Sequence, residues 1–312
     1  MPAIATHYLF GQEVYRRLIE KNRKDIIAVI RKYRQDFNIG LQGPDPMFYY
    51  NPLQKNEVVE YASRIHDRSG AEFLNNAKLH IKESRDFRAL AYVLGFVCHY
   101  ALDSEAHPTV NRLGKDSKGH IQIETELDRE ILLREILKRD AKHREEKYLL
   151  KYNRKQSKAG YRNPFGKKNE LMVLPNFYSS KPSVKPEKIR RYRFARYEKD
   201  LEKSIQPLYP ELSEKQIQKS LESFVNYNRL LYSPSGMNIS VFKGVELLMG
   251  KYEKFSSLAL TSRRWKKHVE HAKCIVPIYE LAISIATDLL IEFFDSIRYG
   301  TPLSKRFDKT FN

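Results

Sequence analysis

The chain has 312 residues, of which 41% are hydrophobic and 12% aromatic, and its formal net charge is +18. This composition excludes a chain that is disordered throughout, and the length permits one large domain or two modest ones. Charged residues make up 30% of the chain and Gly and Pro are few, which favours helices over a strand-rich sandwich. We expect one domain, residues 1–312, with an appended segment.

The sequence shows no sign of export or of a membrane span. It begins Met-Pro-Ala-Ile-Ala-Thr-His, without the basic and apolar regions of a secretory signal. The most apolar run, Ala89–Cys98, is ten residues long, which suits a buried core helix and is too short to cross a membrane. We therefore expect a soluble, cytoplasmic protein without a transmembrane segment, with possible peripheral contact with a membrane.

The first element in chain order is a helix. Apolar residues recur at helical spacing from His7 to Ile30, and Thr6 is placed to cap the first turn. Residues 39–46 follow, where Gly and Pro stand too close together for a helix. This stretch places Asp45 between two prolines, and we expect it to lie on a stiff loop.

Further helices are predicted at 58–66 and 71–82, and a strongly apolar one runs from Asp86, a plausible N-cap, to about His107. His99 lies deep in this last helix. A polar turn at 111–119 separates it from a helix at 120–152, which His120 and Glu124 open.

The second half of the chain begins with a region where helical periodicity fails. Residues 151–188 carry scattered Gly and Pro among basic residues, which indicates a loop or insertion. Helices are predicted at 187–205, 214–231 and 275–297, the last packing through Leu281, Ile285, Leu289 and Phe293 or near neighbours. Since no strand alternation is found, we expect an all-α fold, with a helical core at 1–150 and helices of 189–312 packed on it.

Histidines and carboxylates recur at a spacing that suits metal binding. His99, Asp103 and His107 stand four residues apart, so they share one helix face, and His120 and Glu124 repeat this spacing. A single histidine is more often structural than a ligand. An ionisable pair inside the apolar stretch 89–102, however, is unfavourable unless it is paired or binds a metal. Imidazole and carboxylate without thiolate favour zinc over manganese or iron.

The two cysteines do not suggest another chemistry. Cys98 and Cys274 lack CxxC spacing, so neither a disulfide framework nor a thiolate zinc finger is indicated, and we expect two buried thiols.

Several short segments together resemble the zinc-dependent phospholipase C family, which is related to single-strand-specific zinc nucleases. The resemblance covers about residues 4–130. Its segments are Thr6-His7-Tyr8, Gly43-Pro44-Asp45, Ile65-His66-Asp67, Gly95 to Asp103, Ala106-His107-Pro108 and His120 to Glu124. The resemblance implies a multi-helix bundle of the phospholipase C and zinc nuclease type, with the metal site between helices.

The resemblance also implies a set of ligands for two or three zinc ions. One ion would be held by His66, His99, Asp103 and Asp45, and a second by His107, His120 and Glu124. A third would use His7, with Asp103 bridging to the first. In secreted relatives the amine of a processed N-terminal residue also binds the third ion. This chain begins with Met1-Pro2, whose amine or imino nitrogen would take that place.

Clustered zinc ions would supply the chemistry, because they lower the pKa of bound water from 15.7 toward about 7 and neutralise charge on phosphoryl oxygens. Water is then the nucleophile. Asp45 is the catalytic candidate, since it could bind metal and also orient or deprotonate that water, and both roles stay open. Asp67 and Glu105 stand beside ligands and are candidates for supporting them, although solvated carboxylates are the favoured interpretation.

A basic, aromatic segment bears on the substrate. Residues 138–200 contain 20 Lys and Arg against 7 Asp and Glu, interleaved with Tyr and Phe. Such a mixture suits an anionic membrane surface or single-stranded nucleic acid, or is simply a solvated face. We expect phosphodiester hydrolysis, first of phospholipids and alternatively of single-stranded nucleic acid. A third possibility is a binding or structural protein that retains zinc for folding.

Overall fold

The structure, a computed structural model, is predominantly helical in the residues that it describes. These are 4–52, 54–114, 119–121, 123–128, 130–132, 134–135, 138, 142, 197–231 and 270–312. Within these ranges no strand occurs, and an isolated bridge pairs Ser69 with Thr310. The predicted all-α fold is confirmed. The predicted loop at 151–188 and most of the basic segment 138–200 lie outside the described residues.

The helical start of the chain is confirmed, but a break divides it. Residues 7–30 belong to two helices, α1 (Ile4–Glu20) and α2 (Lys24–Lys32), and α3 (Arg34–Gly40) follows directly. The break falls at Asn22, whose φ of 55° is left-handed and cannot continue an α-helix. The prediction that Thr6 caps α1 was also wrong, because the helix already begins at Ile4.

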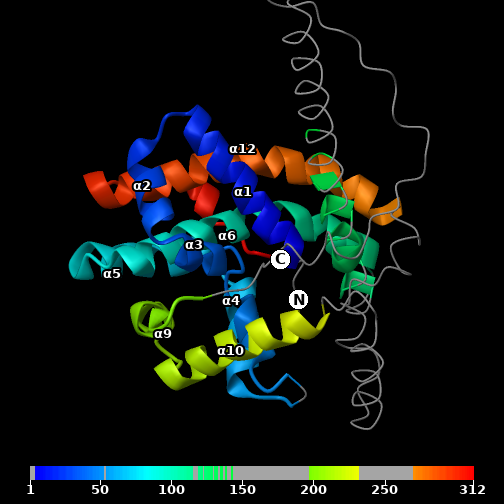
Figure 1. Cartoon of the computed structure of the whole chain (residues 1–312), viewed down its shortest axis with the longest axis horizontal. Coiled ribbons are helices and arrows are strands. Elements are labelled where there is room, and N and C mark those ends of the chain that lie inside the picture. Colours follow the sequence, from blue (N-terminus) through cyan, green and yellow to red (C-terminus); the bar gives the residue numbers. More distant parts are fainter. Residues whose placement is uncertain are drawn as a thin grey trace, which may run out of the picture.

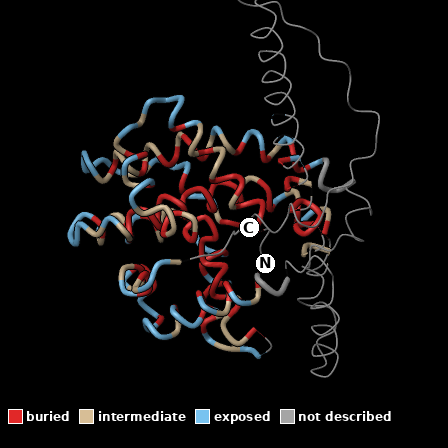
Figure 2. Tube along the Cα trace, in the orientation of Figure 1, coloured by how far each residue is buried: buried red, intermediate tan, exposed pale blue. Residues whose placement is uncertain are grey.

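Helix α6 (Phe87–Gly114) is the centre of the fold, and it is buried along almost its whole length (Figure 2). Asp86 caps it as predicted, accepting hydrogen bonds from the backbone N–H groups of Arg88 and Ala89. The predicted turn at Asn111 was wrong. The helix continues through Pro108 to Gly114, and this continuation buries Val110.

Three helices make the most extensive contacts with α6 among the described elements. They are α3, α1 and the long helix α12 (Glu270–Tyr299), which lies across the upper part of the view in Figure 1. Contact between α3 and α6 is close because it is made by glycines. A Cβ added to Gly95 would lie 2.2 Å from the carbonyl oxygen of Phe37, and one at Gly40 would lie 1.9 Å from that of Tyr92.

Helix α12 buries most of the predicted face, with neighbouring residues taking part and Leu281 excluded. Leu289 and Phe293 are buried, but Leu281 is 60% exposed and Ala282, Ala286 and Leu290 complete the buried stripe. Among the described helices, the stretch Cys274–Tyr299 of α12 is long and apolar enough to cross a membrane. In this fold, 44% of the apolar 18-residue part of that stretch is buried. Cys274 is exposed, contrary to the prediction, whereas Cys98 is buried in α6.

A second group of elements covers the other side of the metal-ligand candidates. It comprises η1 (Asp45–Tyr49), α4 (Glu57–Asp67), α9 (Leu201–Ile205), η2 (Gln206–Leu208) and α10 (Glu214–Leu231), with α10 packed against η1. Asp45 therefore begins a short 3-10 helix, which the two prolines permit, and does not lie on an irregular loop. The helix predicted at 187–205 begins only at Leu201 in the described part, because 197–200 are not helical.

The remaining elements connect the two groups. Helix α5 (Gly70–Ser84) packs on α6 and α12, and η5 (Lys305–Phe307) follows α12. Beyond η5, the chain enters the middle of the fold, where Figure 1 marks its last residue. Phe307 and Phe311 are both fully buried there.

Candidate metal centre

Five parts of the chain bring the eight predicted ligands into one cluster. They are α1, η1, α4, α6 and the helical residues 119–128, apart from 122, which the structure does not describe. Seven of the eight residues are buried and His120 is partly buried. The cluster comprises His7, Asp45, His66, His99, Asp103, His107, His120 and Glu124.

Asp103 lies in the middle of the cluster. Its Oδ1 is 3.2 Å from Nε2 of His7 and 3.8 Å from Nε2 of His107, and its Oδ2 is 3.1 Å from Nε2 of His99. His99 and His107 stand one turn before and one turn after Asp103 on α6, as their spacing predicts. One carboxylate thus faces imidazoles from two helices, which is the arrangement of a bridging ligand.

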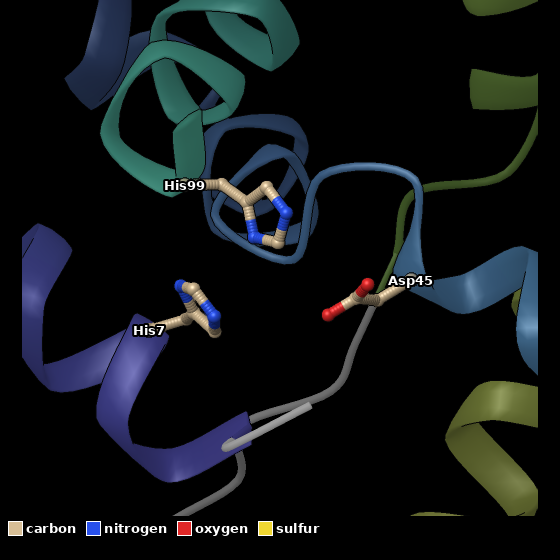
Figure 3. Close-up of side chains that lie close together, drawn as sticks. All are labelled: His7, Asp45 and His99. Atoms are coloured by element: carbon tan, nitrogen blue, oxygen red, sulfur yellow. The ribbon is translucent and has the colours of Figure 1, made fainter. Parts of the chain in front are cut away.

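The nearby donor atoms form three groups, each with atoms within 4.8 Å of one another: His7 with Asp45 and His99; His66 with His99 and Asp103; and His107 with His120 and Glu124. Figure 3 shows the first group, in which side chains from α1, η1 and α6 point toward a common space. The third group coincides with the set implied for a second zinc. Asp45, implied for the first ion, is grouped with His7 and also lies 3.1 Å from Nε2 of His66.

Three histidines are oriented by hydrogen bonds on the side away from the cluster. Nδ1 of His66 lies 2.8 Å from the carbonyl oxygen of Ala62, and Nδ1 of His120 lies 2.8 Å from Oδ1 of Asn111. Nδ1 of His107 lies 2.6 Å from the carbonyl oxygen of Phe311. Each oxygen accepts a hydrogen bond from Nδ1–H, which leaves Nε2 as the nitrogen that faces the carboxylates and is placed to bind a metal. Protein-bound metals are ligated by histidines held in this way.

His99 provides the strongest test of whether this cluster suits a metal. Its side chain is fully buried, and among the described residues its Nδ1 makes no hydrogen bond, while its Nε2 lies 3.1 Å from Oδ2 of Asp103 without the geometry of a hydrogen bond. Nδ1 of His7 has none either. Buried polar atoms are rarely left without partners, since each such atom is destabilising by about 1–3 kcal/mol. A metal ion would satisfy these nitrogens, so the donor set fits zinc.

Burial and neighbouring charges act in opposite directions on the histidines. Burial lowers the pKa of His99 to about 4, so its imidazole is neutral, the form that binds a metal. Burial would also lower the pKa of His107, but the charge of Asp103 and the hydrogen bond to Glu124 raise it to about 9. Nε2 of His107 and Nε2 of His120 lie 3.2 and 3.1 Å from Oε1 of Glu124.

The carboxylates of the cluster are held in their charged form. Burial alone would raise the pKa of Asp45, Asp103 and Glu124. Nearby histidines lower the pKa of Asp45 and Asp103 below its ordinary value, and the positive charge of the N-terminus, followed by His107 and His120, does the same for Glu124. Three anionic carboxylates in a buried site create a strong preference for cations.

Gly43 and Tyr92 fix the approach of the Asp45 segment to α6. Gly43 has a φ of +53° and lies so close to His99 that an added Cβ would be 2.2 Å from the ring. Its carbonyl oxygen accepts a hydrogen bond of 3.0 Å from the Tyr92 hydroxyl, which also pairs with the hydroxyl of Tyr209 at 2.5 Å. The turn before Asp45 is thus held from both sides.

Sequence reasoning missed two polar residues that support ligands. Asn111 orients His120, and Asp128 accepts hydrogen bonds from the backbone N–H groups of Ala5 and Thr6, 3.2 and 2.7 Å long, at the start of the helix that carries His7. Both stand four residues after a predicted ligand, Asn111 after His107 and Asp128 after Glu124. Extending the four-residue spacing by one step would have found them.

Asp67 and Glu105 are not merely solvated. Oδ1 of Asp67 accepts a hydrogen bond from Nδ2 of Asn312, and Oε1 of Glu105 pairs with Nζ of Lys309, at 2.7 and 2.6 Å. Both carboxylates therefore hold residues 309–312 beside the cluster, a role that no local sequence pattern indicates.

Imidazole and carboxylate donors grouped around a shared buried aspartate in a helical fold are a donor set that suits zinc. A comparison with known families agrees. The family model described as zinc-dependent phospholipase C matches residues 6–168, which is more than half of the chain, so the chain belongs to this family. No curated protein and no solved structure matches the chain.

Proposed function

We propose that this chain hydrolyses phosphodiester bonds with two or three zinc ions, and that phospholipids are its first substrate class. Membership of the family supports zinc-dependent hydrolysis and favours phospholipid over nucleic acid. The observation that carries the proposal is the overlap of the donor groups. His99 belongs to two of them, and Asp103 faces histidines of more than one. Such sharing suits ions close enough to act on one phosphate.

Zinc, when bound, supplies Lewis acidity toward phosphoryl oxygens and makes water nucleophilic near neutral pH. The protein's own part is positioning. Asp45 points toward the space that His7 and His99 also face (Figure 3), and its segment is held by Gly43. There its carboxylate can accept a hydrogen bond from a water molecule while it also contacts His66. We therefore assign Asp45 both to metal binding and to orienting the attacking water.

The side from which substrate reaches the site is indicated by exposure. Among the eight cluster residues, the His120 side chain is the most exposed at 19%, whereas His99 is at 0%. The group of His107, His120 and Glu124 is therefore the nearest to solvent within the described part of the chain. We infer that the phosphate approaches from this side and that His7 and His99 lie at the inner end.

The test is a comparison of substrates with the zinc-loaded chain. Phosphatidylcholine vesicles, vesicles containing anionic phospholipid, and single-stranded DNA are incubated at equal phosphodiester concentration. We expect diacylglycerol and phosphorylated head group from the vesicles, and no cleavage after chelation. Asp45→Asn and His99→Ala should each lower the rate at least about a hundredfold, while the control His80→Ala, at a half-buried residue of α5 outside the cluster, leaves it unchanged.

Other outcomes decide among the alternatives. Cleavage of DNA alone would replace phospholipid by nucleic acid as the substrate. Stoichiometric zinc with no hydrolysis of any of the three substrates would contradict the proposal and favour a protein that uses zinc for folding. Undiminished rates in both site variants would show that hydrolysis takes place elsewhere.

A further inference from the structure

Phe311, near the end of the described residues, makes backbone hydrogen bonds to two of the cluster histidines. The backbone N–H of Phe311 donates a hydrogen bond of 3.1 Å to the carbonyl oxygen of His66, in α4. The carbonyl oxygen of the same residue accepts the Nδ1–H of His107, in α6, at 2.6 Å. A single peptide segment therefore connects ligands from two helices.

The Phe311 side chain continues this contact inside the fold. It is fully buried, and its ring centroid lies 5.5 Å from that of His66 and 6.0 Å from that of His99. Phe96 and Tyr100 of α6 complete its surroundings, with ring centroids 5.6 and 5.1 Å away. The ring places apolar surface beside both imidazoles.

The residues around Phe311 are themselves held in place. Lys309 pairs with Glu105, which stands between Asp103 and His107, and Asn312 donates to Asp67, the neighbour of His66. In addition, the carbonyl oxygen of Lys309 accepts the backbone N–H of Gly70, 2.9 Å away. Three contacts thus fix the segment on either side of Phe311 against the elements that carry ligands.

We propose that Phe311 is a positioning residue of the metal centre. Its carbonyl oxygen keeps the proton of His107 on Nδ1, so that Nε2 faces Glu124. Its ring holds His66 and His99 in an apolar environment. This inference rests on the zinc part of the proposed function and is independent of the substrate. Groups that orient metal-bound histidines typically change metal affinity by 10–100-fold when they are removed.

The chain provides a matched control for Phe311. Phe307 lies in the same segment, is likewise fully buried, and stacks on Tyr100 at 6.1 Å. It has no ring contact with a cluster histidine among the described residues. Replacing either phenylalanine by alanine removes similar apolar area, so both variants should lose similar stability without zinc. Only Phe311→Ala should also disturb the ligands.

The experiment measures zinc affinity by chelator competition, the absorption spectrum of the cobalt-substituted protein, and unfolding of the zinc-free protein in urea. Phe311→Ala is expected to weaken zinc binding at least about tenfold and to shift the cobalt spectrum, whereas Phe307→Ala keeps the native affinity within about threefold. If Phe311→Ala does not fold, Phe311→Leu and Lys309→Met, which keep the core filled, should each show a smaller loss of affinity in the same direction.

The inference is overturned if the Phe311 variants that fold bind zinc like the native chain with an unchanged cobalt spectrum. It is also overturned if the Phe307 and Phe311 variants lose affinity equally, because Phe311 would then act through stability alone. A native chain that binds no zinc would instead refute the metal centre of the proposed function. Native zinc binding without hydrolysis would leave this inference standing and refute the activity.

Discussion

At the scale of single residues, Gly43 combines two demands that can be separated by experiment. Its left-handed φ disfavours any side chain, and the ring of His99 occupies the space where a Cβ would lie. Gly300 shares the left-handed φ, at +74°, but a Cβ there would meet only Nζ of Lys82, 4.0 Å away. The two glycines thus isolate the effect of displacing His99.

Gly43→Ala is expected to lower zinc affinity at least about tenfold, because His99 or the Asp45 segment must move. Gly300→Ala should cost about 1 kcal/mol of stability from backbone strain and leave zinc affinity unchanged. Calorimetric zinc titration and urea unfolding of both variants measure these quantities. Equal zinc affinity in the two variants would show that the site tolerates displacement of the ring.

The sequence was most informative about which individual residues form the site. His99, Asp103 and His107 lie together because side chains four residues apart project from the same face of an α-helix. His7, Asp45 and His66 come from separate elements, so no spacing relates them, and only the resemblance to a family indicated them. Phe311 could not be predicted, since its link to His66 and His107 is made by backbone atoms, which every residue possesses.

At the scale of elements, Asp128 joins two helices that each carry ligands. Its carboxylate replaces the missing intrahelical partners of the first N–H groups of α1, and it stands one turn after Glu124. The helix that provides Glu124 therefore holds the N-terminal turn of α1, and this contact fixes the position of His7.

Asp128→Ala is expected to destabilise the zinc-free protein by about 2 kcal/mol, because two N–H groups at a buried helix start lose their acceptor. Asp128→Asn keeps one acceptor oxygen and should lose about half as much. Urea unfolding at neutral pH measures both. A loss below about 0.5 kcal/mol in the alanine variant would show that solvent replaces the carboxylate.

Elements also show why helix boundaries were harder to predict than helices. The apolar spacing of residues 7–30 continues across the break at Asn22, because both α1 and α2 place their apolar faces on the same core. In α12, apolar residues are so frequent that the sequence does not specify one face, and the buried stripe follows Ala282 and Ala286, whose small side chains permit close packing. Boundaries and faces thus depend on partners distant in sequence.

At the scale of the whole molecule, the cluster concentrates three carboxylates and five histidines in the interior, where they are unfavourable without a cation. Metal binding should therefore stabilise the entire fold. At free zinc about a thousandfold above the dissociation constant, the gain is about 4 kcal/mol, which corresponds to about 6 °C in Tm for a chain of this size.

Thermal denaturation followed by circular dichroism, with and without a chelator, tests this expectation. Removal of zinc should lower Tm by about this amount, and added zinc should restore it. His80→Ala, which leaves the cluster intact, should show the same zinc-dependent difference as the native chain. A Tm that does not respond to chelation would contradict a metal centre in the core.

The contacts of Phe311 have a consequence for how the protein matures. The centre draws on residues from His7 to Phe311, so its geometry is complete only when nearly all of the chain shown here has been synthesised. Chains tend to fold from the N-terminal part during synthesis, and here that part alone would place His66 and His107 without the segment that joins them. Zinc would thus be held at full strength only after Phe311 has been synthesised, and a nascent chain that ends before this residue would hold the metal less tightly.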